Sequence, residues 1–167
     1  MRQILELLER DAQLSHDTLA TMTGLPVEEV SAAIARWQAS GAIRRYKAVI
    51  DWDAVDSELY GDPTAETVTA FIDVSLAPAR GVGFDDVATR IARFPEVRSV
   101  YLVSGSQDLR CTVDGRSIRA VSDFVSQKLS TIDRVRATAT HFVLKTYKRD
   151  GDAFTAPDPD HRLPVTP

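Results

Sequence analysis

The chain has little cysteine, little histidine and no long apolar run. Its 167 residues include one cysteine, Cys111, and three histidines that lie far apart in the sequence. A disulfide framework and a cysteine or histidine metal cluster are therefore not expected, because each needs several such residues at close spacing. The N-terminus carries acidic residues within its apolar run and has no small-residue cleavage site, so it does not resemble a signal peptide.

Membrane contact is equally unexpected. No uncharged apolar run approaches the roughly 18 residues that a membrane-spanning helix needs. The hydrophobic fraction of 44% is normal for a globular protein, and the chain is long enough for one medium domain or two small ones. We therefore expect a cytoplasmic protein.

Charge is nearly balanced, with 20 basic and 24 acidic residues and a net charge of −4. This balance argues against a surface covered in basic patches, but it leaves room for a local one.

The first 50 residues have the pattern of three short helices. Apolar residues recur at helical spacing in residues 2–11, and a second helix follows Ser15, a good N-cap, and ends at Gly24. A third helix is predicted from Pro26 to Ser40, with a β segment over residues 42–50. This outline is typical of a winged helix-turn-helix, in which the third helix meets the DNA major groove. A small helical dimerisation cap is the alternative.

Basic residues cluster where the wing is predicted. Arg44, Arg45 and Lys47, together with Arg36, are the candidates for phosphate contacts, although such a cluster is also compatible with an ordinary solvated face. Through Val55 the chain has six basic and eight acidic residues. Non-specific DNA affinity comes largely from phosphate neutralisation, so a single copy of this predicted first domain should bind DNA weakly.

Residues 51–66 are predicted to be a linker, because acidic residues, Gly61 and Pro63 break any periodicity. Residues 67–149 form a second domain, and residues 150–167, rich in proline, a disordered tail. In the second domain, strands are predicted at Val68–Leu76, Val97–Val103, Leu109–Val113 and Val135–Tyr147. Helices are predicted from Phe84 to Phe94 and from Ser117 to about Leu129.

The resulting order, βαββαβ, is that of a ferredoxin-like domain, so the fold class is α+β. Such a sheet carries helices on one face only. The other face would remain as an exposed apolar patch unless something covered it. We therefore expect two copies of the chain to associate with their sheets facing each other.

A polar turn joins the second and third predicted strands of this domain. Ser104, Gly105, Ser106, Gln107 and Asp108 offer more hydrogen-bonding groups than a hairpin needs, so they are candidates for holding a small polar ligand. An ordinary solvated loop is the alternative. The sequence has no nucleophile–base pair, no metal-ligand spacing and no phosphate loop, so we do not expect an enzyme or a bound cofactor.

Several stretches resemble the Lrp/AsnC family of prokaryotic transcription factors, across roughly residues 2–149. They are ILELLERDAQLS, LATMTGLPVEEVSAAIARWQASGAIRRYKAVID, FPEVRSVYLVSGSQDL and ATATHFVLKTY. The family commonly has tyrosine before the turn aspartate, where this chain has Gln107, and basic or neutral residues where this chain has Glu28 and Glu29.

The resemblance implies a regulator that binds double-stranded DNA and assembles as dimers, and further as tetramers or octamers. It also implies an amino acid or related effector at subunit contacts of the C-terminal domain, with Thr138 and Thr140 as further candidates. Backbone N–H groups and hydroxyls around Gly105 would hold a carboxylate. Asp108 would either accept from an ammonium group or cap the turn.

In the first domain, Glu28, Ser31 and Ala32 would face bases while Arg36, Arg44, Arg45 and Lys47 hold phosphates. A metabolite-binding oligomer that has lost or weakened DNA binding is the alternative function.

Overall fold

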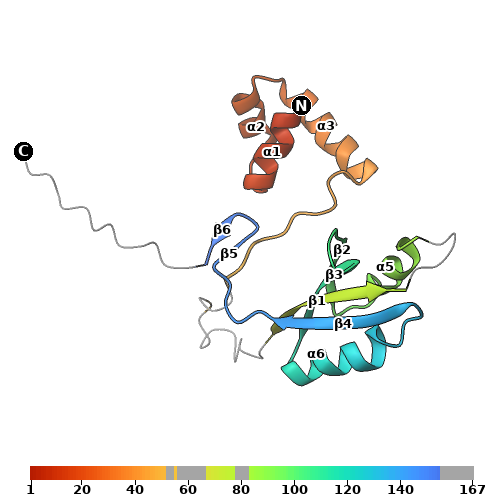
Figure 1. Cartoon of the computed structure of the whole chain (residues 1–167). Helices are drawn as coiled ribbons and strands as arrows, with labels where there is room; N and C mark the ends of the chain where they lie inside the picture. Colours follow the sequence, from red (N-terminus) through yellow and green to blue (C-terminus); the bar gives the residue numbers. More distant parts are fainter. Residues whose placement is uncertain (52–54, 56–66, 78–82, 155–167) are drawn as a thin grey trace, which may run out of the picture. The chain divides into compact units, whose positions relative to one another are not determined.

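The computed structural model describes residues 1–51, 55, 67–77 and 83–154, which form two compact units, residues 1–50 and the chain from residue 51 onward (Figure 1). Apart from Asp51 and Val55, the predicted linker lies outside the described residues, as do residues 155–167 of the predicted tail.

The first unit consists of helices α1 (Arg2–Arg10), α2 (His16–Thr23) and α3 (Val27–Ser40). Local sequence signals set their ends. The Ser15 hydroxyl accepts a hydrogen bond from the Thr18 N–H at 3.1 Å and begins α2. Gly24 and Gly41 end α2 and α3 in the left-handed conformation, with φ of 70° and 75°. All three helices lie where the sequence predicted them.

An apolar core holds the three helices together. Its buried members come from every helix: Ile4, Leu19, Ala20, Val30 and Ile34. Trp37 and Ile43 pack against it at the end of α3. The second and third helices are therefore braced by the first, as a helix-turn-helix requires.

The strand predicted over residues 42–50 is wrong, because this segment has no regular structure. A strand needs a hydrogen-bonding partner. The rest of residues 1–51 is helix, turn or short connection and offers no second extended segment.

The second unit contains a four-stranded antiparallel sheet in the order β2-β3-β1-β4, which confirms the α+β class (Figure 1). The strands are β1 (Val68–Leu76), β2 (Val97–Leu102), β3 (Leu109–Gly115) and β4 (Val135–Phe142). Helix α5 (Asp85–Ile91) lies between β1 and β2, and α6 (Ile118–Phe124) continues after β3 into a π-helical turn at Val125–Leu129. The element order is thus the predicted βαββαβ.

The core of this unit lies between the sheet and the two helices. Alternate residues of β1, from Ala70 to Leu76, are buried with Val87 and Ile91 of α5 and with Val121 and Phe124 of α6. The period of two along β1 places its other residues on the opposite face.

That opposite face is polar rather than the apolar patch expected from the sequence. It carries Thr69 and Asp73 from β1, Ser99 from β2, Arg110 and Thr112 from β3, and His141 from β4. Phe71 and Tyr101 are its large exposed apolar side chains. Within the described part of the second unit, the helices pack on the other face only.

Two predicted boundaries fail at the C-terminal end. β4 ends at Phe142 instead of Tyr147, although the Val143 N–H still donates to the Thr69 carbonyl at 2.9 Å. β1 begins at Val68, so the last residues before Tyr147 have no β1 residue to pair with. Residues 150–154, predicted to be disordered, belong to a hairpin of β5 (Lys148–Arg149) and β6 (Asp152–Ala153). Asp150 and Gly151 form its two-residue turn with positive φ, a sequence signal that marks hairpins.

Candidate functional site

The turn between β2 and β3 is closed by its own backbone. The Val103 N–H donates to the Asp108 carbonyl at 3.0 Å, so residues 104–107 project as a short loop. Gly105 has φ of 135°, a conformation that side chains disfavour, and a Cβ added there would meet no atom within 4 Å. The loop therefore needs glycine for its backbone path rather than for space.

Asp108 fastens this loop to β1. Its N–H donates to the Val74 carbonyl at 3.1 Å, and its carboxylate accepts from the Leu76 N–H at 2.7 Å. The carboxylate thus continues the β1–β3 hydrogen bonding beyond the last backbone pair, Val74 with Leu109. These contacts match the turn-capping alternative for Asp108.

Gln107 gives the loop a second attachment to β1, since the Ser75 hydroxyl donates to its side-chain carbonyl. Ser75 and Leu76 lie where the register between β1 and β4 shifts. The loop is therefore fixed against an irregular end of the central strand.

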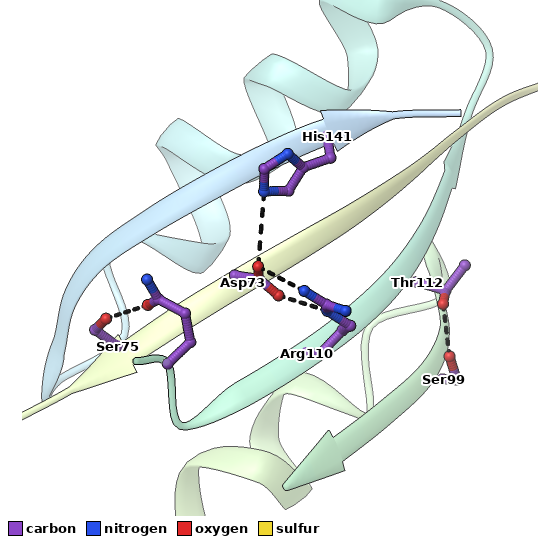
Figure 2. A network of polar contacts seen from close by, with 7 residues as sticks. Asp73, Ser75, Ser99, Arg110, Thr112 and His141 are labelled. Carbon is purple, nitrogen blue, oxygen red and sulfur yellow. Dashed lines mark hydrogen bonds and ion pairs between the residues drawn. The ribbon is translucent and has the colours of Figure 1, made fainter. Parts of the chain in front are cut away.

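An ion pair lies next to this loop on the polar face of the sheet (Figure 2). Arg110 of β3 donates through Nε and Nη2 to the two carboxylate oxygens of Asp73, at 2.7 and 2.8 Å. His141 Nε2 of β4 lies 3.6 Å from the same carboxylate. The hydrogen bonds from Arg110 lower the pKa of Asp73 below its usual value, although burial acts in the opposite direction.

The loop and the ion pair border a cavity of about 530 Å³ that is open to solvent. Its lining comprises Asp73, Arg110 and residues 102–107. Four of the predicted ligand residues, Ser104, Gly105, Ser106 and Gln107, are thus brought together around one cavity. Hydroxyl, amide and guanidinium groups dominate it, a composition that suits a small polar molecule.

Two predicted ligand residues lie elsewhere. Thr140 pairs with Ile72 and Thr138 with Val74, and both partners are buried beneath the helices. Cross-strand partners point to the same side of a sheet, so both threonines face the helical layer. The structure does not bring them to the cavity.

Asp73 and Arg110 are the site residues that sequence reasoning missed. Each is a charged residue in a predicted strand, and this was the only feature of the sequence that could have pointed to it as a site residue. Their meeting depends on the register of β1 against β3, in which Asp73 lies opposite Arg110. No local pattern in the sequence gives that register.

The residues predicted to face DNA bases do not share one environment. Glu28, Ala32 and Arg36 are exposed at four-residue intervals on α3 and so lie on one face of it. Ser31 is half-buried, and its hydroxyl is hydrogen-bonded to His16 Nδ1 of α2 at 2.8 Å. Ser31 therefore links the second and third helices and points toward a separate cavity of about 310 Å³ that His16 also lines.

The predicted phosphate-binding residues Arg44, Arg45 and Lys47 are exposed in the irregular segment after α3. Arg44 folds back so that its guanidinium lies near Gly41. An irregular segment at the end of a braced helix can follow a curved phosphate backbone, so the loss of the predicted strand does not remove these groups from consideration.

The described residues include no group of three or more acidic, cysteine or histidine side chains suited to a metal. They also include no helix long and apolar enough to cross a membrane.

Comparison with known proteins gives a consistent result. The Lrp/AsnC ligand binding domain matches residues 69–153. The HTH-type transcriptional regulator YugG of Bacillus subtilis is 48% identical over 99% of this chain and 95% of its own length. Both units of the chain therefore have a counterpart in a protein named as a regulator.

Solved structures agree. The leucine response regulatory protein LrpA of Mycobacterium tuberculosis is 26% identical, with a TM-score of 0.70 over 91% of this chain and 95% of its own. A transcriptional regulator of Neisseria meningitidis in complex with L-methionine is 25% identical, with a TM-score of 0.65 over 92% of each chain. The chain belongs to the Lrp/AsnC family of transcriptional regulators.

Proposed function

We propose that this protein is a transcriptional regulator that binds double-stranded DNA through residues 1–50 and a small effector, an amino acid, through the cavity at the β2–β3 loop. The observation that carries this proposal is the match of the whole chain to an HTH-type regulator, together with the ligand binding domain over residues 69–153. Such a protein acts where the chromosome is, so we place it in the cytoplasm.

The first unit would bind DNA as a helix-turn-helix. Three braced helices leave the face of α3 that carries Glu28, Ala32 and Arg36 exposed. In this arrangement α3 enters the major groove while Arg36 and the cations after α3 contact phosphates. Ser31, tied to His16, would set the angle between α2 and α3 rather than contact a base.

DNA binding is tested by mobility shift with fragments upstream of the protein's own and neighbouring genes, across a series of salt concentrations. The logarithm of affinity should fall linearly with the logarithm of salt. The double variant Arg44→Ala, Arg45→Ala should reduce that slope by about two, because each phosphate contact contributes about one. Arg2→Ala with Arg10→Ala, two exposed arginines of α1, is the matched control.

Absence of any shift at low salt would instead favour an effector-binding module without DNA recognition. The exposed Glu28 and Glu29 at the start of α3 favour that second candidate, because carboxylates repel phosphates.

The cavity would bind an amino acid. The related Neisseria meningitidis regulator has been crystallised with L-methionine. In this chain the β2–β3 loop offers two serine hydroxyls and an amide, and together with Arg110 of β3 it borders an open space of about 530 Å³. That space is large enough for any natural amino acid.

We further propose that the chain acts as a dimer that assembles into tetramers or octamers. The polar face of the sheet, with Phe71 and Tyr101 exposed on it, would form the contact between copies. Effector binding at the loop beside that face would alter the assembly only if the assembled states bind the effector unequally. Sedimentation velocity at micromolar concentration tests the assembly, and a monomer would contradict it.

A further inference from the structure

A zwitterionic amino acid presents a carboxylate and an ammonium group, and the cavity does not offer equally good partners for the two charges. The carboxylate of Asp108, the obvious partner for an ammonium group, accepts the Leu76 N–H at 2.7 Å. Asp108 is also not among the residues that line the cavity. It is committed to holding the loop on β1.

Asp73 is the one carboxylate among the described lining residues. It is 7% exposed, and both of its oxygens accept hydrogen bonds from Arg110. His141 approaches the same group from β4. Its charge is therefore already neutralised within the sheet, and it has little surface to offer a ligand cation.

Arg110 is in the opposite situation. A guanidinium group has five N–H donors, and Asp73 takes two of them. The side chain is 53% exposed and lines the cavity. The bidentate contact with Asp73 holds the guanidinium plane in one orientation, so its remaining donors are aimed before a ligand arrives.

The loop adds further donors next to Arg110. Ser104 and Ser106 carry hydroxyls, and the side-chain carbonyl of Gln107 is occupied by Ser75, which leaves its NH₂ group to face a ligand. The cavity thus offers several donors and no uncommitted carboxylate within the described residues.

We infer that Arg110 binds the carboxylate of the effector, and that the cavity recognises small carboxylates by this group rather than by an acidic partner for an amine. The inference rests on the proposed effector binding and names the chemistry of that site. Asp73 and His141 act as positioning residues, since they touch Arg110 or its partner and not the ligand.

This assignment separates three probes that differ by one group each. L-Methionine has both charges, its 2-oxo acid keeps the carboxylate and lacks the amine, and L-methioninamide keeps the amine and lacks the carboxylate. The 2-oxo acid should bind within about threefold of the amino acid, whereas the amide should bind far more weakly. The same comparison applies to whichever of the twenty amino acids binds best.

Isothermal titration of the full chain with these probes tests the inference. Arg110→Gln should lower affinity for the acids by roughly tenfold to a hundredfold, the effect of losing a charge-assisted hydrogen bond. Arg110→Lys keeps a cation beside Asp73 and should lose less, which guards against a variant that fails to fold. Thermal melting of the unliganded variants checks folding directly.

The matched control is Arg98→Gln. Arg98 pairs with Asp114 at 3.2 Å, also between β2 and β3, but does not line the cavity. Its loss should leave affinity unchanged. Undiminished binding of the acids by folded Arg110→Gln would overturn the inference while leaving the proposed amino-acid sensing intact.

The remaining outcomes are also distinguishable. Binding of 2-oxo acids that depends on Arg110, without binding of any amino acid, would support the inference and contradict amino-acid sensing. Tight binding of the amide, or no binding of any probe, would contradict the inference; in the second case the proposed effector class fails as well.

Discussion

At the scale of single residues, Gly115 is fixed by close packing. A Cβ at this position would lie 2.7 Å from Cγ2 of Val121, a fully buried residue of α6. The last residue of β3 and the helix that follows it therefore approach as closely as glycine permits. The contact sets how α6 lies on the sheet.

Gly115→Ala should accordingly destabilise the protein by about 1–3 kcal/mol, the usual cost of overpacking a core. Urea unfolding followed by circular dichroism measures this. Gly83→Ala is the control, because a Cβ there would meet no atom within 4 Å and should change the unfolding free energy little. Equal behaviour of the two variants would show that α6 shifts freely.

Asp108 offers a second test at this scale, between its two interpretations. If its oxygen serves the Leu76 N–H, Asp108→Asn should keep effector binding because the amide retains an acceptor. Asp108→Ala should weaken binding and lower the melting temperature, since a backbone N–H loses its partner. Loss of binding in Asp108→Asn at an unchanged melting temperature would instead identify the carboxylate as an ammonium acceptor.

At the scale of elements, three of the ion pairs in the second unit each contain a carboxyl group with a lowered pKa. Asp73 joins β1 to β3 through Arg110, Asp86 of α5 contacts Arg134 just before β4, and Glu96 contacts Lys128 of the π-helical turn. Each carboxyl has a pKa below its ordinary value of 3.8 (Asp) or 4.5 (Glu). For Asp73 and Glu96 the main cause is the hydrogen bond from the basic partner, and for Asp86 it is the Val87 N–H.

A lowered pKa means that, at pH values between the folded-state and unfolded-state pKa, the folded state binds fewer protons than the unfolded state. The stabilisation is therefore complete above about pH 4.5 to 5 and is lost as the pH falls through the folded-state values. Urea unfolding at pH 7, 4.5 and 3 should show this loss. Asp73→Asn should reduce the pH dependence, and an identical dependence in that variant would exclude Asp73 as a contributor.

The elements themselves were largely predictable. β1 spans Val68–Leu76 as its alternating pattern indicated, and Ser15, Gly24 and Gly41 end helices as their backbone preferences require. The segment at residues 42–50 was not predictable, because strand propensity does not reveal whether a partner strand exists. The Asp150–Gly151 hairpin was predictable in principle, but its proximity to a proline-rich tail concealed it.

The candidate site was half predictable. Loop composition identified residues 104–107, since turn chemistry is local. Arg110, Asp73 and His141 meet only after three strands adopt a particular register, which depends on the whole sheet. The same nonlocal information places Thr138 and Thr140 on the helical side.

At the scale of the whole molecule, assembly and DNA affinity should be linked. Residues 1–50 contain equal numbers of acidic and basic residues, six of each, so a single copy of the first unit has little net attraction for phosphates. Linking several units raises avidity by roughly 10²–10⁴ when the geometry allows simultaneous contact. An assembly-deficient variant should therefore lose most of its DNA binding.

Tyr101→Asp places a charge on the polar face, where Tyr101 is 59% exposed. It should shift sedimentation toward smaller species and weaken DNA binding in parallel. Ile118→Asp is matched in exposure, also 59%, but lies on α6 on the helical side of the sheet, and should change neither property. Normal assembly of Tyr101→Asp would place the contact between copies elsewhere.

The alternation of side chains along β1 also limits which sequence changes relatives of this chain can accept. Every second residue of β1 fills the core, while the residues between them, which include Asp73 and Ser75, lie on the opposite face. One inserted or deleted residue within β1 would exchange the two sets, sending Asp73 into the core and Val74 to the surface. Length variation should therefore be absent from this strand, and loop exchange between relatives must preserve residues 68–76 as one block.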